Sequence, residues 1–281
     1  MMKLSVITIN YNDREGLKRT VDSVLAQDFR DFEWIVIDGG STDGSVEVIE
    51  NTVKLLSEEG ERSSLVSFWC SEPDRGIYNA MNKGIMHARG EYVNFLNSGD
   101  TYHDSGVLSA VFAFDFPNNP GVVYCDYYDI LENGTVFPQR LPEVLDLAFL
   151  MRRPINHQSA FIRCEIFSDG LYDESYRIVA DGKAFLKWMV QGVEYFHIPV
   201  FVADFHMGGV HNLKAELTNM ERKRMVDETV PQALQQVVRE LEAQRQVWVD
   251  YPVLRDVLDI YQSNRGKRKF ITLLVRVLNM F

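Results

Sequence analysis

The sequence predicts an α/β protein whose first half is a nucleotide-fold-like layer with a parallel sheet flanked by helices. Through the first hundred residues, short apolar or β-branched runs alternate with segments whose apolar residues recur at helical spacing. Such alternation is typical of β-α-β units, which build parallel sheets. The composition, 46% apolar and 25% charged over 281 residues, suits a soluble chain with one large domain and an appendage.

In the first half of the chain, strands are expected at residues 4–9, 32–37, 65–70 and 92–96. The first strand ends at Asn-Tyr-Asn-Asp (residues 10–13), which supplies N-cap side chains for a helix running to about Gln27. A second helix is expected between the second and third strands, and a third helix near Gly76. The fourth strand is mostly apolar, as expected of a strand that is covered on both faces.

The second half has a looser pattern. Strands are expected at residues 122–128 and 196–205, with an amphipathic segment at 143–151, an apolar run at 160–162 and a helix at 182–191. From about residue 215 to 264 the sequence is charged and helical. Residues 267–281 begin basic, continue apolar and contain no acidic side chain.

Charge, cysteine content and hydropathy exclude several classes of protein. A net charge of −11 argues against general nucleic-acid binding, which needs a basic surface. Three widely spaced cysteines show no metal-ligand spacing and fit a reducing compartment. The N-terminus begins with a strand rather than a signal peptide, and no apolar run reaches the ~18 residues that span a bilayer. A cytoplasmic location is therefore expected.

Three loops follow expected strands at residues 10–13, 38–44 and 97–100, and the carboxyl ends of such strands form the usual ligand-binding edge. None of them contains a G-x-G-x-x-G motif, which argues against a dinucleotide-binding dehydrogenase. Asp38 could accept hydrogen bonds from a base or ribose, or simply form a helix-entry turn. Asp74 could hold a ribose hydroxyl or cap the next helix. Lys83 could meet a phosphate or be solvated.

Two isolated carboxylates are the strongest candidates for chemistry. Asp100 lies in a loop of small residues, where it could bind Mg²⁺ or Mn²⁺ together with substrate phosphates, or act only as a turn residue. Asp181 lies between apolar residues and a helix. A dry pocket would raise the pKa of Asp181 and suit it to accept a proton, whereas the alternative is a plain N-cap.

Three of the six histidines lie among small or polar residues, namely His157, His206 and His211. His206 and His211 are candidates for phosphate or metal contacts, and a solvated or core histidine is the alternative for each.

Seven segments, in order along the chain, resemble the inverting nucleotide-sugar glycosyltransferases of family 2, which have the GT-A fold. The resemblance implies an α/β fold with a Rossmann-like, mixed but mostly parallel sheet flanked by helices. The segments are SVITINYN, EWIVIDGGSTDGS, SEPDRGIYNAMNKG, FLNSGD, NHQSAFI, the stretch around Asp181 and FHMGGVHN. They cover roughly residues 3–212. The likeness is strongest to bacterial exopolysaccharide enzymes typified by the colanic-acid glycosyltransferases, in which LNSGD also occurs.

The resemblance implies a role for each segment. Asp181 corresponds to the general base that deprotonates the acceptor hydroxyl, and residues 206–212 would border the diphosphate. Asp100 would hold a divalent cation, Mg²⁺ or Mn²⁺, with His206 or His211 as further candidate ligands. The expected nucleotide-sugar contacts are Thr8, Asn10, Asp38, Gly39, Asp74, Lys83, Asn97, Ser98, Gly99, His157 and Gln158. Among them, Thr8, Asp38 and Asp74 would line the base and ribose site. His157 and Gln158 would border the donor sugar or the acceptor.

Some positions depart from the family pattern. Asn97 and Gly99 stand where the commoner pattern has aspartates, so Asp100 is the only acid of its loop. Asn79 replaces an acid that is common in the exopolysaccharide subgroup. The resemblance divides the chain into a catalytic domain, residues 1–212, and a C-terminal helical extension with a basic and apolar tail, residues 213–281.

The expected function is therefore transfer of a sugar from a UDP- or GDP-linked donor to a hydroxyl of a glycan or lipid-linked acceptor, in bacterial surface polysaccharide synthesis. A nucleotide-sugar-binding protein with little or no catalysis is one alternative, because the loop at 97–100 has few acids. A nucleotidyltransferase is another. The tail could contact the inner membrane surface, where a lipid-linked acceptor would lie, or pack on the catalytic domain or a second copy of the chain.

Overall fold

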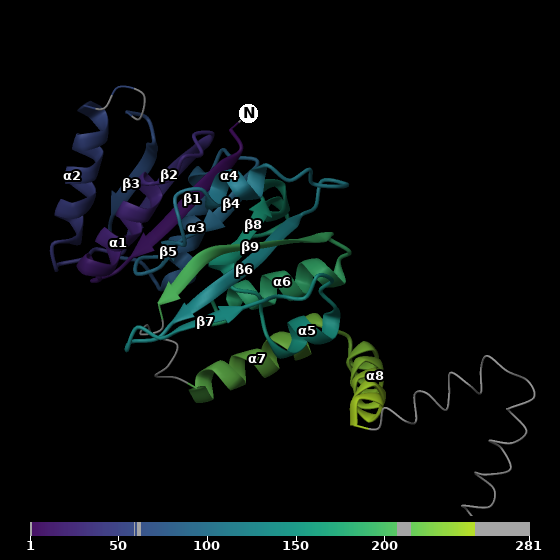
Figure 1. Cartoon of the computed structure of the whole chain (residues 1–281). Coiled ribbons are helices and arrows are strands. Elements are labelled where there is room, and N and C mark those ends of the chain that lie inside the picture. The colour runs from purple at the N-terminus through teal and green to yellow at the C-terminus, as the bar shows by residue number, and fades with distance from the viewer. Residues whose placement is uncertain (1, 59, 61–62, 207–214, 251–281) are drawn as a thin grey trace, which may run out of the picture. The chain divides into compact units, whose positions relative to one another are not determined.

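The computed structural model describes residues 2–58, 60, 63–206 and 215–250. Within them, one nine-stranded mixed sheet has the order β3-β2-β1-β4-β8-β6-β9-β5, and β7 pairs with β6 outside this path. Strand pairs β1–β2, β1–β4, β2–β3 and β6–β9 are parallel, and the other pairs are antiparallel. Figure 1 shows helices on both faces of this sheet.

The first half of the chain is the expected series of β-α-β units. Its elements are β1 (Leu4–Asn10), α1 (Arg14–Leu25), β2 (Phe32–Asp38), α2 (Ser45–Glu58), β3 (Val66–Ser71), α3 (Ile77–His87) and β4 (Tyr92–Phe95). Asp13 caps α1, as expected, because its side chain accepts a hydrogen bond from the Gly16 amide. Strands β1, β2 and β4 are buried along their whole length, which explains their continuous apolar runs.

The second half adds the antiparallel strands. Its elements are β5 (Thr101–Tyr102), α4 (Val107–Phe112), β6 (Val122–Ile130), β7 (Val136–Gln139), α5 (Leu147–Arg152), a 3₁₀ turn (His157–Ser159), β8 (Ala160–Arg163), a 3₁₀ helix (Cys164–Asp169), α6 (Ala180–Val190) and β9 (Tyr195–His206). The expected strands at 122–128 and 196–205 are confirmed. Strands β5 and β7 were not expected, because two and four residues carry too little alternation to be recognised.

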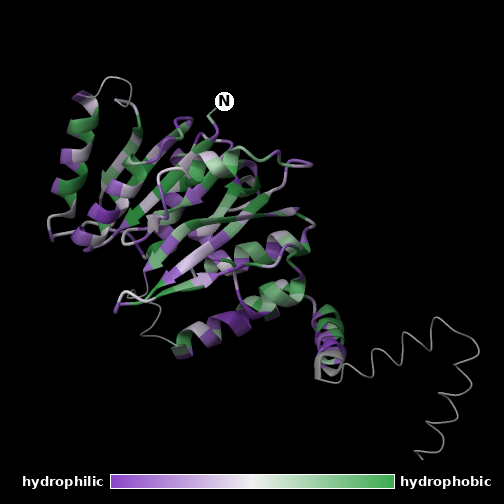
Figure 2. Ribbon diagram, in the orientation of Figure 1, coloured by the Kyte–Doolittle hydropathy of each residue, from purple (hydrophilic) through white to green (hydrophobic). Residues whose placement is uncertain are grey.

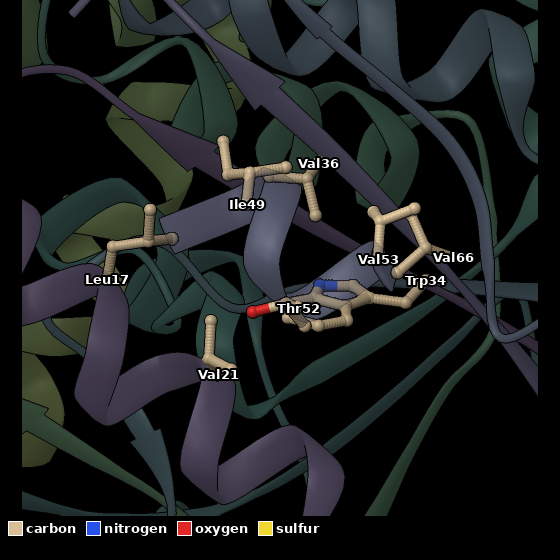
Figure 3. A pocket seen from close by; sticks show the side chains of 8 residues that line it. All are labelled: Leu17, Val21, Trp34, Val36, Ile49, Thr52, Val53 and Val66. Atoms are coloured by element: carbon tan, nitrogen blue, oxygen red, sulfur yellow. The ribbon is translucent and has the colours of Figure 1, made fainter. Parts of the chain in front are cut away.

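Helices α1 and α2 cover one face of β2 and β3. Their apolar side chains enclose a cavity of about 10 Å³, roughly the space of one water molecule, beside Trp34 and Val36 (Figure 3). The Trp34 indole N–H donates to the hydroxyl of Thr8 at 3.0 Å, so this packing is anchored to β1. The cavity is a small packing defect of the core, since apolar side chains and Thr52 line it.

The chain is divided into two compact units, residues 1–230 and 231–281. Helix α7 (Ala215–Thr229) belongs to the first unit and α8 (Gln232–Asp250) to the second. The expected helical stretch is therefore interrupted at Val230–Pro231. Figure 2 shows a long hydrophilic stretch in α7. The expected boundary after residue 212 stays a prediction.

None of the helices in the described part of the chain combines the length and the apolar composition that crossing a bilayer requires. The tail at residues 267–281, which could contact a membrane or a second copy, lies outside the described residues, as does His211.

Candidate active site

Asp38 ends β2 and organises the loop that follows it. Its side chain is fully buried, and its two oxygens accept hydrogen bonds from the side chains of Asn10, Ser41 and Ser71 and from the amides of Gly40 and Ser41. Burial acts to raise the pKa of Asp38, but these hydrogen bonds outweigh it and lower the pKa. The carboxylate thus holds three strand ends together beneath the loop surface.

Asp74 and Tyr11 both lie close to Gly39. A Cβ atom on Gly39 would come within 2.6 Å of the Asp74 carboxylate and 3.1 Å of the Tyr11 ring, so a side chain at this position would displace them. Asp74 also accepts a hydrogen bond from the Gly76 amide at the start of α3. The Tyr11 side chain is 67% exposed, which leaves an aromatic ring accessible near Gly39. Tyr11 was not among the expected site residues.

Two other expected donor contacts have partners in the structure. The Thr8 hydroxyl is buried and accepts from Trp34, below the loop surface. The Lys83 ammonium forms an ion pair with Glu72 at 2.7 Å, so a phosphate contact would have to replace or share that pair.

The loop at 97–100 is a tight turn beside the first turn of α1. Gly99 has φ +96°, a conformation that side-chain-bearing residues rarely adopt, which gives a structural reason for glycine where the family pattern has an acid. The Thr20 hydroxyl bonds the turn at the Gly99 amide and the Asp100 carbonyl. The Ser98 hydroxyl lies 3.2 Å from the Asp13 carboxylate.

Asp100 is almost completely buried. One carboxylate oxygen accepts from the His206 amide at 3.1 Å, and the other accepts from the Gln158 side chain. Burial raises the pKa of Asp100 to about 7, although the hydrogen bonds from Gln158 and His206 act in the opposite direction. A bound cation would favour its ionised form.

Asp181 is the second residue of α6, whose N-cap is Val179, so the alternative that Asp181 is only an N-cap is wrong. One carboxylate oxygen accepts from the Tyr78 hydroxyl at 2.9 Å and from the Gly182 amide at 2.8 Å. The other oxygen accepts from His157 Nδ1 at 2.8 Å. Among the described residues, this second oxygen has no further hydrogen-bond donor.

The expectation of a raised pKa for Asp181 is also wrong. Burial does act to raise the pKa, but the hydrogen bond and charge of His157, together with hydrogen bonds from Gly182 and Tyr78, lower it below its usual value. Apolar neighbours in the sequence indicated burial, but they could not reveal donors that come from distant positions. Asp181 is therefore a carboxylate that stays ionised at neutral pH.

Two consecutive residues join the two candidate acids. His157 contacts Asp181 through Nδ1, and its Nε2 lies 2.9 Å from the Asn97 amide nitrogen. Gln158 contacts Asp100. The 3₁₀ turn thus brings the loop at 97–100 and the start of α6 into one polar cluster, in which Asn97 and Gln158 also take part.

Hard oxygen ligands suitable for Mg²⁺ or Mn²⁺ are present around Gly99. No group of three or more His, Cys, Asp or Glu side chains gathers in the described part of the chain. Such cations commonly take only one or two protein carboxylates, with substrate phosphates and water completing the shell. Asp100 and Asp13 are two carboxylates of this kind. The Asp13 carboxylate lies 3.3 Å from the position that a Cβ atom on Gly99 would take. Asp13 was expected only as a helix cap.

His206 lies at the end of β9, half-buried, and burial lowers the pKa of its ring. Its backbone amide rather than its ring contacts Asp100. The His206 ring stays a candidate metal or phosphate ligand because this amide contact places the residue next to Asp100.

A family model described as "Glycosyl transferase family 2" matches residues 5–171, more than half of the chain. The chain belongs to glycosyl transferase family 2. An uncharacterized glycosyltransferase from Mycobacterium tuberculosis is 35% identical over 187 residues, which cover 66% of this chain and 68% of that protein. Both findings confirm the family and the class of enzyme expected from the sequence. The colanic-acid subgroup stays a prediction.

Two solved structures place this family 2 chain among GT-A-like folds. S. aureus TarS 1–349 in complex with UDP-GlcNAc has a TM-score of 0.61 at 17% identity, covering 83% of this chain and 69% of that one. The mannosyltransferase PcManGT from Pyrobaculum calidifontis, in complex with GDP-Man and Mn²⁺, has a TM-score of 0.60 at 18% identity, covering 99% and 81%. Another TarS 1–349 structure is covered over only 60% of its length. At these identities the likeness shows the fold, and the expected fold class is confirmed.

Proposed function

We propose that this chain transfers a sugar from a UDP- or GDP-linked donor to a hydroxyl group of a glycan or lipid-linked acceptor, with inversion at the anomeric carbon. The observation that carries the proposal is the cluster in which His157 and Gln158 join Asp181 to Asp100 at the carboxyl edge of the sheet. A low-pKa carboxylate and a separate carboxylate suited to a cation are the two acidic groups that such a displacement needs.

In this proposal the donor nucleoside lies on the loop organised by Asp38, with Asn10, Gly39 and Asp74 at its edge. Asp38 acts by holding this loop, since its own oxygens are occupied by protein donors. The exposed Tyr11 ring offers a face on which a base can stack. Thr8 supports the site from below, and Lys83 would reach a phosphate only by sharing its bond with Glu72.

Asp181 is the proposed general base. Its second oxygen has a lone pair beyond the His157 bond, and this lone pair would accept the proton of the acceptor hydroxyl. The hydroxyl oxygen forms a bond to the anomeric carbon while the bond to the departing diphosphate breaks on the opposite face. His157 and Tyr78 keep the carboxylate oriented during this step. General-base catalysis of this kind is typically worth ~10²–10⁴ in rate.

Asp100 and Asp13 would hold a Mg²⁺ or Mn²⁺ ion, which when bound supplies charge neutralisation for the diphosphate leaving group. The PcManGT complex with GDP-Man and Mn²⁺ supports this proposal. Ser98, Gly99 and Asn97 form the turn that presents Asp100. His206 and His211 remain proposed secondary contacts, and His211 lies outside the described residues.

The resemblance to exopolysaccharide enzymes supports a place in bacterial surface polysaccharide synthesis. An acceptor linked to a lipid would lie at the cytoplasmic face of the inner membrane, and the basic and apolar tail would bring the enzyme to that surface. Flotation of the intact chain with anionic liposomes, compared with a chain ending at Asn264, tests this part. Equal flotation of both chains would argue instead for a tail that packs on protein.

The function itself is tested with UDP-GlcNAc and GDP-mannose, the donors in the TarS and PcManGT complexes. We expect one of them to raise the melting temperature of the chain in the presence of Mn²⁺, because a ligand of the native state stabilises it. Release of nucleoside diphosphate should then require an added acceptor, and nuclear magnetic resonance of the product should show an inverted anomeric configuration. A retained configuration would rule out single displacement through Asp181.

One observation favours a second candidate. Both oxygens of Asp100, the only acid of its loop, are already bonded to Gln158 and His206. If those bonds persist in solution, the chain would bind a nucleotide sugar without transferring it. Donor-induced stabilisation without turnover across a wider donor and acceptor panel would support that candidate.

A further inference from the structure

Asn94 is a buried amide in the middle of β4, and its side chain has no contact with solvent. The other residues of this strand are aromatic or aliphatic. Burying an amide group without hydrogen-bond partners is strongly unfavourable, so the partners of Asn94 indicate what this residue does.

The Asn94 side chain binds the backbone of the 3₁₀ turn. Its nitrogen lies 2.9 Å from the Ala160 carbonyl, 3.1 Å from that of Gln158 and 3.4 Å from that of His157. The His157 carbonyl also accepts a hydrogen bond from the Ala160 amide at the end of the turn, and Asn94 adds donors to the turn's carbonyls from a neighbouring strand. The Asn94 oxygen accepts from the Tyr102 hydroxyl at 2.8 Å, which fixes the orientation of the amide.

These bonds connect both sides of the proposed site. His157 and Gln158 are the two residues whose side chains contact Asp181 and Asp100. Tyr102 is also buried, and it lies two residues after Asp100 along the chain. A single amide behind the site therefore holds the backbone that carries both contacts, and a tyrosine from the strand after Asp100 orients that amide.

We propose that Asn94, oriented by Tyr102, is a positioning residue that sets the spacing of Asp100 and Asp181 by holding the backbone of His157 and Gln158. The inference rests on the proposed function and deepens it. Asn94 touches neither acid and has no part in the chemistry. A displacement of about 1 Å at a reacting group can reduce the rate about 10²-fold. Loss of this support should therefore slow the proton transfer by changing the geometry of the site alone.

Two variants test the role. Asn94→Leu removes the amide at similar volume, and Tyr102→Phe removes only the hydroxyl that orients it. We expect Asn94→Leu to lower kcat about 10- to 100-fold and Tyr102→Phe less. The loop at Asp38 has none of these contacts, so the affinity for the nucleoside part of the donor should stay unchanged.

Matched controls separate positioning from general destabilisation. Asn82→Leu removes another buried amide, which bonds the backbone of Tyr172, and Tyr124→Phe removes a buried hydroxyl that bonds the carbonyls of Pro142 and Glu143. Neither contacts His157 or Gln158. We expect both to retain wild-type kcat even where their melting temperatures fall.

A measurement without substrate completes the test. The protein is labelled with ¹⁵N-histidine and observed by nuclear magnetic resonance. The resonance of the His157 ring N–H that donates to Asp181 is assigned because it is absent from the spectrum of His157→Gln. We expect this resonance to shift or broaden in Asn94→Leu and Tyr102→Phe, and to stay in place in both controls. If Asn94→Leu does not fold, Tyr102→Phe decides the question by the same two readouts.

The outcomes distinguish the inference from the function on which it rests. An unaltered chain that transfers no sugar from any donor overturns the proposed function. A wild-type kcat and an unmoved His157 resonance in both variants overturn the positioning role alone. Equal losses of kcat in the variants and their controls would also overturn it, because they would indicate a purely structural effect.

Discussion

At the scale of single residues, the site contains two buried acids whose surroundings have opposite effects. Asp181 receives hydrogen bonds from three donors, which lower its pKa, whereas burial dominates at Asp100 and raises the pKa to about 7. Different environments of this kind give two like carboxylates different tasks. In the proposed function the ionised Asp181 accepts the proton of the acceptor hydroxyl, and a cation bound beside Asp100 would favour the ionised form of that carboxyl group.

Asp181→Asn should lower kcat by ~10²–10⁴ while leaving nucleotide affinity nearly unchanged, because the substitution removes the proton acceptor and keeps the shape of the side chain. Calorimetric titration with UDP and GDP checks the affinity, and single-turnover transfer checks the rate. Asp146→Asn serves as the control, because it removes the same charge from the N-cap of α5, where asparagine can also accept from the Phe149 amide. Equal losses of binding and turnover in Asp181→Asn would indicate a structural role for this residue.

Asp100→Asn should stabilise the metal-free protein at pH 8 and abolish metal-dependent transfer. The pKa of Asp100 is about 7 in the folded state and about 4 when unfolded, so the folded state binds this proton more tightly. Stability is therefore lost as pH rises from about 4 to 7, and asparagine avoids that loss. We expect a gain on the order of 1–3 kcal/mol at pH 8 and a smaller one at pH 5.

Urea unfolding in the presence of EDTA at the two pH values measures this difference. The same gain at pH 5 and pH 8 would contradict a raised pKa for Asp100. Loss of stability at both values would show that the two hydrogen bonds to its carboxylate outweigh the cost of burying its charge.

The sequence identified both acids because each interrupts an apolar stretch at an element boundary. It identified His157 and Gln158 as site residues without showing that they bond these acids, and it did not identify Tyr78, which is 103 positions from Asp181. Asp13 was read as a helix cap, which it is, but the proximity of its carboxylate to Gly99 depends on how α1 meets the loop at 97–100. Such contacts follow from tertiary packing and leave no local pattern.

At the scale of elements, α7 supports the start of α6, the helix that carries Asp181. The buried Glu221 carboxylate of α7 accepts from the backbone amides of Arg177, Ile178 and Val179. These amides lead into α6, whose first turn leaves amides without internal partners. Met225 of α7 packs against Gly182 beside Asp181. The charged sequence of α7 predicted a helix, but not that one of its acids would be buried.

A second contact between α6 and α7 should respond to acid. Lys183 of α6 bonds Asp173 and Glu228 at 2.8 and 2.7 Å, and the pKa values of both acids are about 2. A lowered folded-state pKa means that the stabilisation is present above about pH 4.5 and is lost as pH falls toward 2. Lys183→Met should therefore destabilise by roughly 0.5–1 kcal/mol at pH 7, with little difference from wild type near pH 2.5.

Unfolding monitored by circular dichroism across this pH range provides the test. Lys187→Met on the same helix is the control, since Lys187 is exposed and forms no ion pair in the described part of the chain. A difference that persists at low pH would assign the effect to packing of Lys183 on the Tyr176 ring, which lies 4.5 Å from its ammonium.

At the scale of the whole molecule, alternating strands and helices predicted the parallel half of the sheet, because each β-α-β unit is a local pattern. The antiparallel half was less predictable. Its central strand β8 has four residues, and it pairs with β4 and β6, which lie far from it in the sequence. That pairing nevertheless decides the site, because it brings the 3₁₀ turn beside β4 and thus His157 beside Asn97.

The sequence and the structure give different C-terminal boundaries for the catalytic domain. The sequence predicts residue 212, whereas the first compact unit of the structure ends at residue 230. Because Glu221 and Met225 support the start of α6, we expect a chain ending at Val230 to keep the melting temperature of this unit, its nucleotide affinity and its turnover. A chain ending at residue 212 lacks α7, leaves three backbone amides without their carboxylate, and should lose turnover and several degrees of melting temperature. Glu221→Gln in the full chain gives an intermediate case, since it keeps one oxygen acceptor and removes the charge. Full turnover by residues 1–212 would establish the earlier boundary and reduce α7 to an accessory helix.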